Sequence, residues 1–193
     1  MQREFLDPEK GPFFEFGQAC YFLARRGETV VGRISAHING LYEQYHDTET
    51  GFFGFFESEN NRETAHALFD AASAWVRQHG KIKIHGPLSF SIYDEVGLLV
   101  DGFDSPPSMM HTHNPPYYED LVTSYGFVKT YDWYAYRISR KPDMAVPHCC
   151  WLLAFSTRGR LSSSQVMTLG TMRPSALEAA WATVSPRKSS SGK

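Results

Sequence analysis

The pattern of apolar and polar positions predicts three strands in the first third of the chain. Apolar runs at 19–24 and 29–36 flank Arg-Arg-Gly-Glu at 25–28, a sequence typical of a tight turn between antiparallel strands. A third run, at 51–57, reads Gly-Phe-Phe-Gly-Phe-Phe-Glu. Such a run favours a strand that is buried on both faces, with glycines where another backbone or a ligand comes close.

A helix is predicted directly after the third strand, over residues 61–79. Asn60 would cap it, with Glu63 at the third helical position, and Gly80 would end it. Apolar residues recur at steps of three and four and define one face of this helix, which comprises Ala65, Leu68, Phe69, Ala72, Trp75 and Val76. We therefore expect Phe69 and Trp75 to face the sheet.

The next part of the chain predicts a strand at 81–85, a helix at 117–125 and a strand at 131–138. Between them lies a long segment, 86–116, that is rich in glycine, proline and acidic residues. A connection of this length is usually functional or loosely ordered, and its apolar run at 98–100 favours order. The element order β-β-β-α-β-α-β predicts an α/β fold, with helices on the faces of a mixed sheet.

Composition places the chain among soluble globular proteins. Its 193 residues suffice for one ordinary domain, and 42% hydrophobic and 15% aromatic residues can form a core. No apolar run approaches the roughly 18 residues of a membrane span, and no apolar signal segment follows the first residues. We expect a cytoplasmic protein without membrane contact. Cys20, Cys149 and Cys150 match neither a disulfide framework nor a spaced zinc motif.

Charge and aromatic content change near Asp143. Up to this residue the chain has 13 Lys and Arg against 20 Asp and Glu, whereas from Met144 onward it has 6 against 1. The first part also holds 25 of the 28 aromatic residues. We expect a domain over 1–143 and an unrelated, disordered, basic, Ser-rich tail over 144–193. Because the cations of the tail are dispersed, we expect no nucleic-acid binding.

Several runs of the first part are similar to a known family. They are 6–14, 31–34, 51–57, 97–104, 114–118 and 125–127. With them the chain resembles the acyl-CoA N-acyltransferase (GNAT) fold and, more closely, its YghO-like group, over about residues 4–140. Members of this group are typically longer at both ends. The resemblance therefore implies a fragment: a GNAT-like mixed sheet flanked by helices and incomplete at both ends.

The resemblance implies N-acyl transfer from acetyl-CoA to a small-molecule amine. This family binds acetyl-CoA where two parallel strands part, with the pyrophosphate on N–H groups of the turn that follows the strand ending here at Glu57. The matching donor-binding positions are Phe55, Phe56, Ser58, Asn60, Asn61, Arg62 and Asn114. The turn lacks the family's spaced glycines, and Glu57 and Glu59 would oppose a pyrophosphate. The alternative function is a catalytically inactive binding or structural module.

Two residues are candidates for the proton transfers of an acyl-transfer reaction. Glu57 is the predicted base, because a poorly solvated carboxylate at the end of an aromatic strand is a good proton acceptor. Its alternative is an exposed turn residue. Tyr118 is the predicted acid, by resemblance to a tyrosine on the corresponding GNAT helix, and its alternative is packing. Asn114 would either bind the cofactor or begin the turn at Pro115–Pro116, and we favour the turn.

A metal site is a competing hypothesis for the long connection. His111 and His113 alternate on one side of an extended segment, with Asp101 and Asp104 upstream, and imidazole with carboxylate can bind a divalent cation. Their spacing matches no known ligand motif. We therefore favour a solvated loop and expect no metal.

Overall fold

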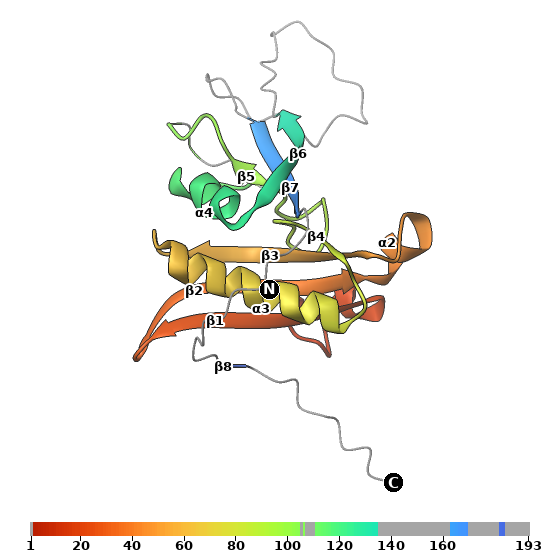
Figure 1. Cartoon of the computed structure of the whole chain (residues 1–193). Helices are drawn as coiled ribbons and strands as arrows, with labels where there is room; N and C mark the ends of the chain where they lie inside the picture. Colours follow the sequence, from red (N-terminus) through yellow and green to blue (C-terminus); the bar gives the residue numbers. More distant parts are fainter. Residues whose placement is uncertain (1, 105, 107–110, 135–162, 170–181, 184–193) are drawn as a thin grey trace, which may run out of the picture.

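The computed structural model describes residues 2–104, 106, 111–134, 163–169 and 182–183. Its strands are β1 (Gly17–Arg26), β2 (Thr29–Asn39), β3 (Thr50–Ser58), β4 (Lys83–Gly86), β5 (Leu98–Leu99), β6 (Phe127–Tyr134), β7 (Ser163–Leu169) and β8 (Ala182–Thr183). Its helices are α1 (Gln2–Phe5), the 3₁₀ helix η1 (Pro12–Glu15), α2 (Gly40–Tyr45), α3 (Arg62–Gln78) and α4 (Tyr117–Tyr125). The predicted mixed α/β architecture is confirmed (Figure 1).

The eight strands form one sheet in the order β5-β7-β4-β3-β2-β1-β8, with β6 paired to β7. Among the described strands the pairing is antiparallel, apart from the parallel pair β3–β4. The predicted hairpin is present as β1 and β2, in which Arg26 pairs with Thr29. Gly27 in its turn has a φ of +60°, a conformation that glycine adopts without steric cost.

Helix α3 covers one face of the sheet and supplies much of the core. Phe69 is 1% exposed and Leu68 and Val76 are fully buried, as the apolar spacing predicted. Gly51 of β3 lies under this helix, because a Cβ there would come within 2.6 Å of Val76. The glycine therefore allows α3 to pack closely on β3.

Two details of α3 differ from the prediction. Asn61, and not Asn60, caps the helix, and its Oδ1 accepts a hydrogen bond from the Thr64 N–H at 3.2 Å. Trp75 is only partly buried and stacks on His79 with ring centroids 4.0 Å apart. The space between α3 and the sheet is already filled by the buried side chains of Leu68, Ala72 and Val76. Trp75 therefore lies on the flank of the helix.

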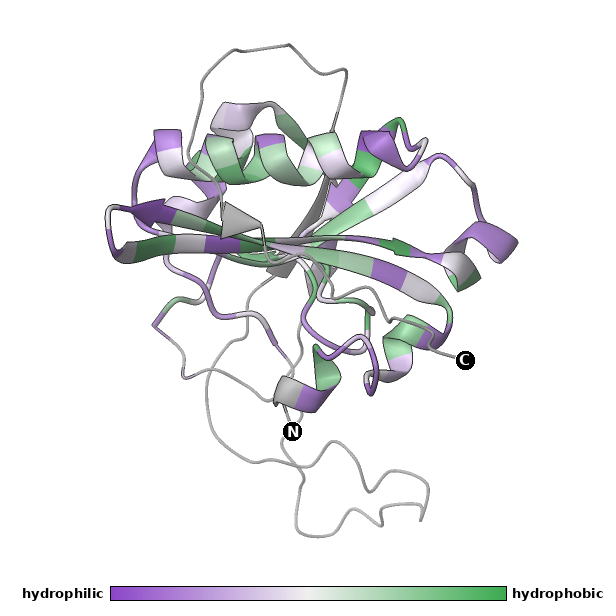
Figure 2. Cartoon of the chain, turned by 90° about the horizontal axis from the view of Figure 1, so that it is seen from below, coloured by the Kyte–Doolittle hydropathy of each residue, from purple (hydrophilic) through white to green (hydrophobic). Residues whose placement is uncertain are grey.

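The opposite face of the sheet is covered by an aromatic layer. Figure 2 shows the long helix on one side of the sheet and the N-terminal helix on the other. Phe90, from the loop after β4, stacks on Phe13 of η1 with ring centroids 4.2 Å apart, and also contacts Phe5 and Phe55. His37 of β2 is fully buried beneath these rings. The centre of the sheet, where the second half of β2 pairs with β3, is thus shielded from water on both faces.

The segment predicted as a tail is described in part. Within 144–193 the structure describes β7, which pairs with β4, β5 and β6, and β8, which pairs with β1. The other residues of this segment, including Cys149 and Cys150, lie outside the described part of the chain. The division of the chain at Asp143 stays a prediction. In the described residues, no helix combines the length and the apolar character needed to cross a membrane.

The burial of His37 predicts a pH dependence of stability. Neither ring nitrogen has a hydrogen-bond partner among the described residues, and burial lowers the pKa of the imidazole from 6.5 to about 3. The unfolded chain takes up a proton near pH 6.5, whereas the folded chain does so only near pH 3. Stability is therefore lost as the pH falls through this window, at up to ~1.4 kcal/mol per pH unit.

We expect urea unfolding at pH 7 and pH 5 to show this loss. The wild type should lose ~2 kcal/mol more between the two conditions than His37→Phe, in which position 37 cannot titrate. The exposed residue His111 provides the control, because His111→Gln should keep the wild-type dependence. Equal losses in the wild type and His37→Phe would contradict the assignment.

Candidate active site

The parallel strands β3 and β4 pair only at the beginning of β3, which leaves its carboxyl half beyond the end of β4. The register joins Thr50 to Lys83 and ends with Phe52 opposite His85. Beyond this point the chain after β4 crosses close to β3, and the Leu88 N–H donates to the Phe53 carbonyl at 2.7 Å. A Cβ at Gly54 would lie 2.0 Å from the Leu88 carbonyl oxygen, so this position requires glycine.

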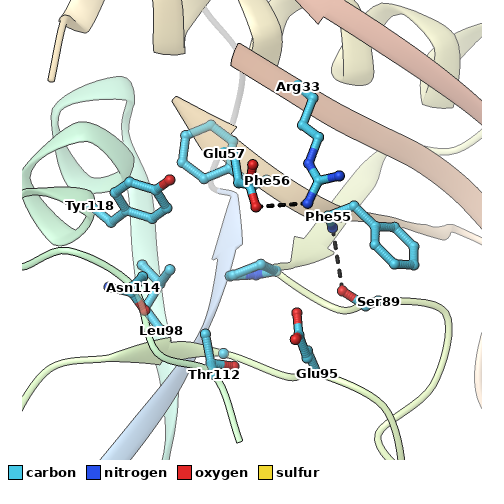
Figure 3. Close-up of a pocket in the computed structure, with 12 residues that line it drawn as sticks. Arg33, Phe55, Phe56, Glu57, Ser89, Glu95, Leu98, Thr112, Asn114 and Tyr118 are labelled. Atoms are coloured by element: carbon cyan, nitrogen blue, oxygen red, sulfur yellow. Dashed lines mark hydrogen bonds and ion pairs between the residues drawn. The ribbon is translucent and has the colours of Figure 1, made fainter. Parts of the chain in front are cut away.

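A cleft opens beside the carboxyl half of β3, beyond the pairing with β4. Its walls come from β2, the carboxyl half of β3, the loop 87–97, β5, the segment before α4, and α4 itself (Figure 3). The lining residues are Arg33, Phe55, Phe56, Glu57, Pro87, Ser89, Glu95, Gly97, Leu98, Thr112, Asn114 and Tyr118. The predicted site residues Phe55, Phe56, Glu57, Asn114 and Tyr118 are therefore brought together in one place.

A bulge in β3 shapes the floor of this cleft. Ser35 pairs with Gly54 and Arg33 with Glu57, so Phe55 and Phe56 together lie opposite a single residue of β2. Phe55 has a φ of +47°, which is unusual for a residue with a side chain, and its N–H donates to Ser89 Oγ at 3.3 Å. Such bulges re-aim side chains and concentrate near functional sites.

The bulge sends the two phenylalanine side chains into different surroundings. Phe55 contacts Phe90 of the aromatic layer, with ring centroids 5.0 Å apart. Phe56 stacks on Phe69 under α3, with ring centroids 4.7 Å apart. Both residues line the cleft, and their rings pack against Phe90 and Phe69 on opposite faces of the sheet. These contacts fix the shape of the floor.

Glu57 ends the floor of the cleft and is paired with a cation. Its Oε1 accepts a hydrogen bond from an Arg33 guanidinium nitrogen at 2.7 Å, and the two side chains are 61% and 49% exposed. The poorly solvated environment that we expected for a base is absent. Glu57 is an exposed carboxylate at the strand end, positioned at the cleft by Arg33, and its role as a base stays a prediction.

Glu59 in the following turn is also neutralised. Arg26 binds it through two nitrogens, at 2.6 and 3.1 Å, and Thr64 Oγ1 donates to it at 2.8 Å. The bond from Arg26 is the first cause of the lowered pKa of this carboxylate. The two carboxylates that we expected to repel a pyrophosphate thus each have an arginine partner.

Two tyrosines of α4 hold the end of β3. The Tyr118 hydroxyl accepts a hydrogen bond from the Ser58 N–H at 3.1 Å, and the Tyr117 hydroxyl donates to the Ser58 carbonyl at 3.0 Å. Tyr118 is 6% exposed, and burial raises its pKa, so the phenol keeps its proton at neutral pH. Tyr118 is therefore packed in the interior, as the alternative stated, and its role as an acid stays a prediction.

The side-chain amide of Asn114 lines the cleft and is bonded to backbone groups. Its Oδ1 accepts from the Leu99 N–H at 2.7 Å, and its Nδ2 donates to the carbonyls of Leu99 at 3.3 Å and Pro115 at 3.0 Å. The amide thus pairs with Leu99 as a neighbouring strand would. Asn114 is thus a buried amide that fixes one wall of the cleft directly before the turn at Pro115–Pro116, and its cofactor role stays a prediction.

The remaining predicted donor-binding residues lie beside the cleft, at the start of α3. Ser58 is buried, Asn60 is exposed, and Asn61 is occupied in capping. Arg62 is exposed at the first helical position. These residues form a turn that leads out of the cleft onto the N-terminus of α3.

The sequence did not identify four polar residues of the cleft: Arg33, Ser89, Glu95 and Thr112. Two of them had a signal in the sequence. Arg33 lies within a run that resembles the family, and Glu95 belongs to an acidic pair in the long connection. In the described part of the chain, no group of three or more His, Cys, Asp or Glu residues could hold a metal ion, and His111, His113, Asp101 and Asp104 form no such group.

Comparison with known proteins gives relatives but no family model, since none matches the chain. The chain is 39% identical over 140 residues to a bacterial ceramide synthase from Caulobacter vibrioides, covering 72% of this chain and 36% of that protein. It is 37% identical over 119 residues to protein YghO from Escherichia coli, covering 62% and 30%. The chain thus spans about a third of the length of the curated relatives it matches. The predicted YghO-like resemblance is supported to this extent.

Among solved structures, the chain is similar to yncA from Salmonella typhimurium, described as an acetyltransferase with its cofactor acetyl-CoA. The identity is 14%, the TM-score is 0.43, and the match covers 83% of this chain and 69% of that chain. At this level of similarity no argument about the present chain rests on it.

The contacts of Asn114 predict a structural role that can be measured. Asn114→Ala should leave the Leu99 N–H buried without an acceptor and lower the free energy of unfolding by ~1–3 kcal/mol. Denaturant unfolding is the measurement. Thr123→Ala, which removes an exposed hydroxyl from the neighbouring helix α4, should cost less than ~0.5 kcal/mol. Similar stabilities of the two variants would exclude this role for Asn114.

Proposed function

We propose that this chain carries the acyl-transfer site of an N-acyltransferase that uses an acyl thioester of CoA, with acetyl-CoA as the first donor to test. The observation that carries the proposal is the cleft along the carboxyl half of β3, beyond the residues that pair with the parallel strand β4. It supports the proposal because the resemblance expects the donor at this place. The likeness to a protein named ceramide synthase agrees with it, since ceramides are amides.

The reaction would join an amine to the acyl carbon. The amine nitrogen attacks the thioester carbonyl, a C–N bond forms, the C–S bond breaks, and a proton lost by the amine balances the proton gained by the leaving thiolate. Glu57 is the proposed proton acceptor, since its exposed carboxylate lines the cleft. Tyr118 is the proposed donor, because its oxygen accepts from Ser58 and its own hydrogen stays available.

The pyrophosphate of the donor would bind at the start of α3. The first N–H groups of a helix favour an anion, and Arg62 adds an exposed cation there. Arg26 and Arg33 compensate Glu59 and Glu57, so this turn no longer carries an excess of negative charge. The acyl end would then lie along Phe55 and Phe56 in the cleft, with the CoA chain leaving past Ser58, Asn60 and Asn61.

A catalytically inactive binding module is the second candidate. It is favoured by the contacts of Asn114 and Tyr118, whose polar groups support the backbone. Calorimetric titration of the full chain with acetyl-CoA, followed by a thiol-release assay over a panel of primary amines, separates the two. Donor binding with amine-dependent thiol release is expected for the enzyme. Binding of an amine without thiol release would favour the binding module.

Arg62 provides a test of donor binding. Arg62→Gln should weaken acetyl-CoA affinity about 10-fold, because one charge-assisted contact to a phosphate is lost. The matched control is Arg77→Gln, which removes an exposed arginine from the last turn of the same helix. Calorimetry should show the control at wild-type affinity. Equal affinities for all three proteins would place the pyrophosphate away from the start of α3.

Glu57 provides a test of proton transfer. Glu57→Gln should leave the melting temperature within a few degrees of wild type, lower kcat ~100-fold and remove the acidic limb of the pH–rate profile. Glu28→Gln changes an exposed glutamate of the β1–β2 turn and should leave kcat unchanged. A normal kcat and pH profile in Glu57→Gln would assign proton transfer to another group.

A further inference from the structure

Most polar side chains of the cleft already have partners. Ser89 Oγ accepts from the Phe55 N–H, and Thr112 Oγ1 donates to the Val96 carbonyl at 3.1 Å. The hydroxyl of Tyr118 and the amide of Asn114 are bonded to backbone, as described above. The amide of Asn114 and the hydroxyl hydrogen of Thr112 are thus engaged, whereas the hydroxyls of Ser89 and Tyr118 act only as acceptors and can still donate to a ligand.

Glu95 differs from these residues. The cleft contains three charged side chains, and the first two, Arg33 and Glu57, neutralise each other at 2.7 Å. The carboxylate of Glu95 is exposed and has neither an ion pair nor a hydrogen bond within the part of the chain that the structure describes. Figure 3 shows it directed into the cleft between Ser89 and Thr112. Among the described residues that line the cleft, Glu95 is thus the charged side chain without a partner.

The backbone holds Glu95 in this position. Its carbonyl accepts from the Ser89 N–H at 2.8 Å, and two residues later the Gly97 N–H donates to the Pro87 carbonyl at 2.8 Å. A bridge between Leu88 and Val96 closes the same loop. Glu95 therefore lies on a segment that is paired like a hairpin and not at a free loop tip. A binding residue requires such a fixed backbone.

The charge of Glu95 already acts on its surroundings. The pKa of the neighbouring Asp94 is raised, first by burial and second by the charge of Glu95. A cation placed in the cleft would relieve this repulsion and gain a charge-assisted hydrogen bond. An anion would be opposed at the same place. The electrostatics of the cleft thus select a positively charged group.

We infer that Glu95 binds the ammonium group of the acceptor and positions its nitrogen beside the floor formed by Phe55 and Phe56. The inference rests on the proposed function, because it names the acceptor class as primary amines that arrive protonated. A simple primary amine is a cation at neutral pH. The bound ammonium releases one proton to solvent before its nitrogen attacks, and the second proton, lost on attack, balances the proton gained by the leaving thiolate. Glu95 is a positioning residue that favours amines over neutral alcohols.

The experiment compares Glu95→Gln with wild type, using hexylamine and its neutral analogue 1-hexanol as probes. Binding to the full chain is followed by NMR, and acetyl transfer by thiol release. Glu95→Gln should weaken hexylamine binding ~5-fold and raise its KM by the same factor. The affinity for acetyl-CoA, the affinity for hexanol and kcat should change less than 2-fold. Glu28→Gln is the control and should change none of these quantities.

The possible outcomes separate this inference from the proposed function. If hexylamine binds wild type and Glu95→Gln equally, or binds neither, the inference is wrong. If Glu95→Gln weakens hexylamine and hexanol alike, charge recognition is excluded. If Glu95 governs hexylamine binding but no thiol is released with any donor, the cationic ligand site stands and the N-acyltransferase proposal fails.

Discussion

The rest of the structure depends on how the backbone N–H and C=O groups of β3 find hydrogen-bond partners beyond the pairing with β4. The strand is buried on both faces, so its polar groups need partners other than water. Beyond the short parallel pairing, Phe53 bonds to Leu88, the Phe55 N–H bonds to a serine hydroxyl, and Ser58 is bonded by both tyrosines of α4. These hydrogen bonds replace those of a neighbouring strand, and they bring the loop after β4 and the tyrosines of α4 to the edge of β3. The cleft is the space that they leave between them.

Much of this arrangement could be predicted because it is encoded locally. The run at 51–57 becomes the buried strand β3, and its glycines lie under Val76 and beside Leu88, where a Cβ would clash. The cap of α3 was placed one residue too early. Asn60 and Asn61 are equally good caps in sequence, and the choice between them depends on how β3 ends in three dimensions. Local signals give the element, and tertiary contacts decide its boundary.

The site was less predictable, because its chemistry depends on residues far apart in the chain. Glu57 was recognised from its place at a strand end, but its partner Arg33 comes from the adjacent strand across a bulge that shifts the register. The role of Asn114 follows from its contact with Leu99, which no periodicity reveals. Glu95 could not be distinguished from an ordinary loop carboxylate without the pairing that holds its loop.

Charge along the carboxyl end of β3 gives the proposed reaction a direction. On the helix side, two arginines neutralise the glutamates of the turn, the charges of Arg62 and Glu63 balance at the start of α3, and the first N–H groups of the helix favour an anion. On the loop side, Glu95 leaves a negative charge in the cleft. An anionic donor and a cationic acceptor would therefore be attracted to different ends of the same floor. The bulge at Phe55 and Phe56 lies between these ends, which is where an acyl carbon and an amine nitrogen would have to meet.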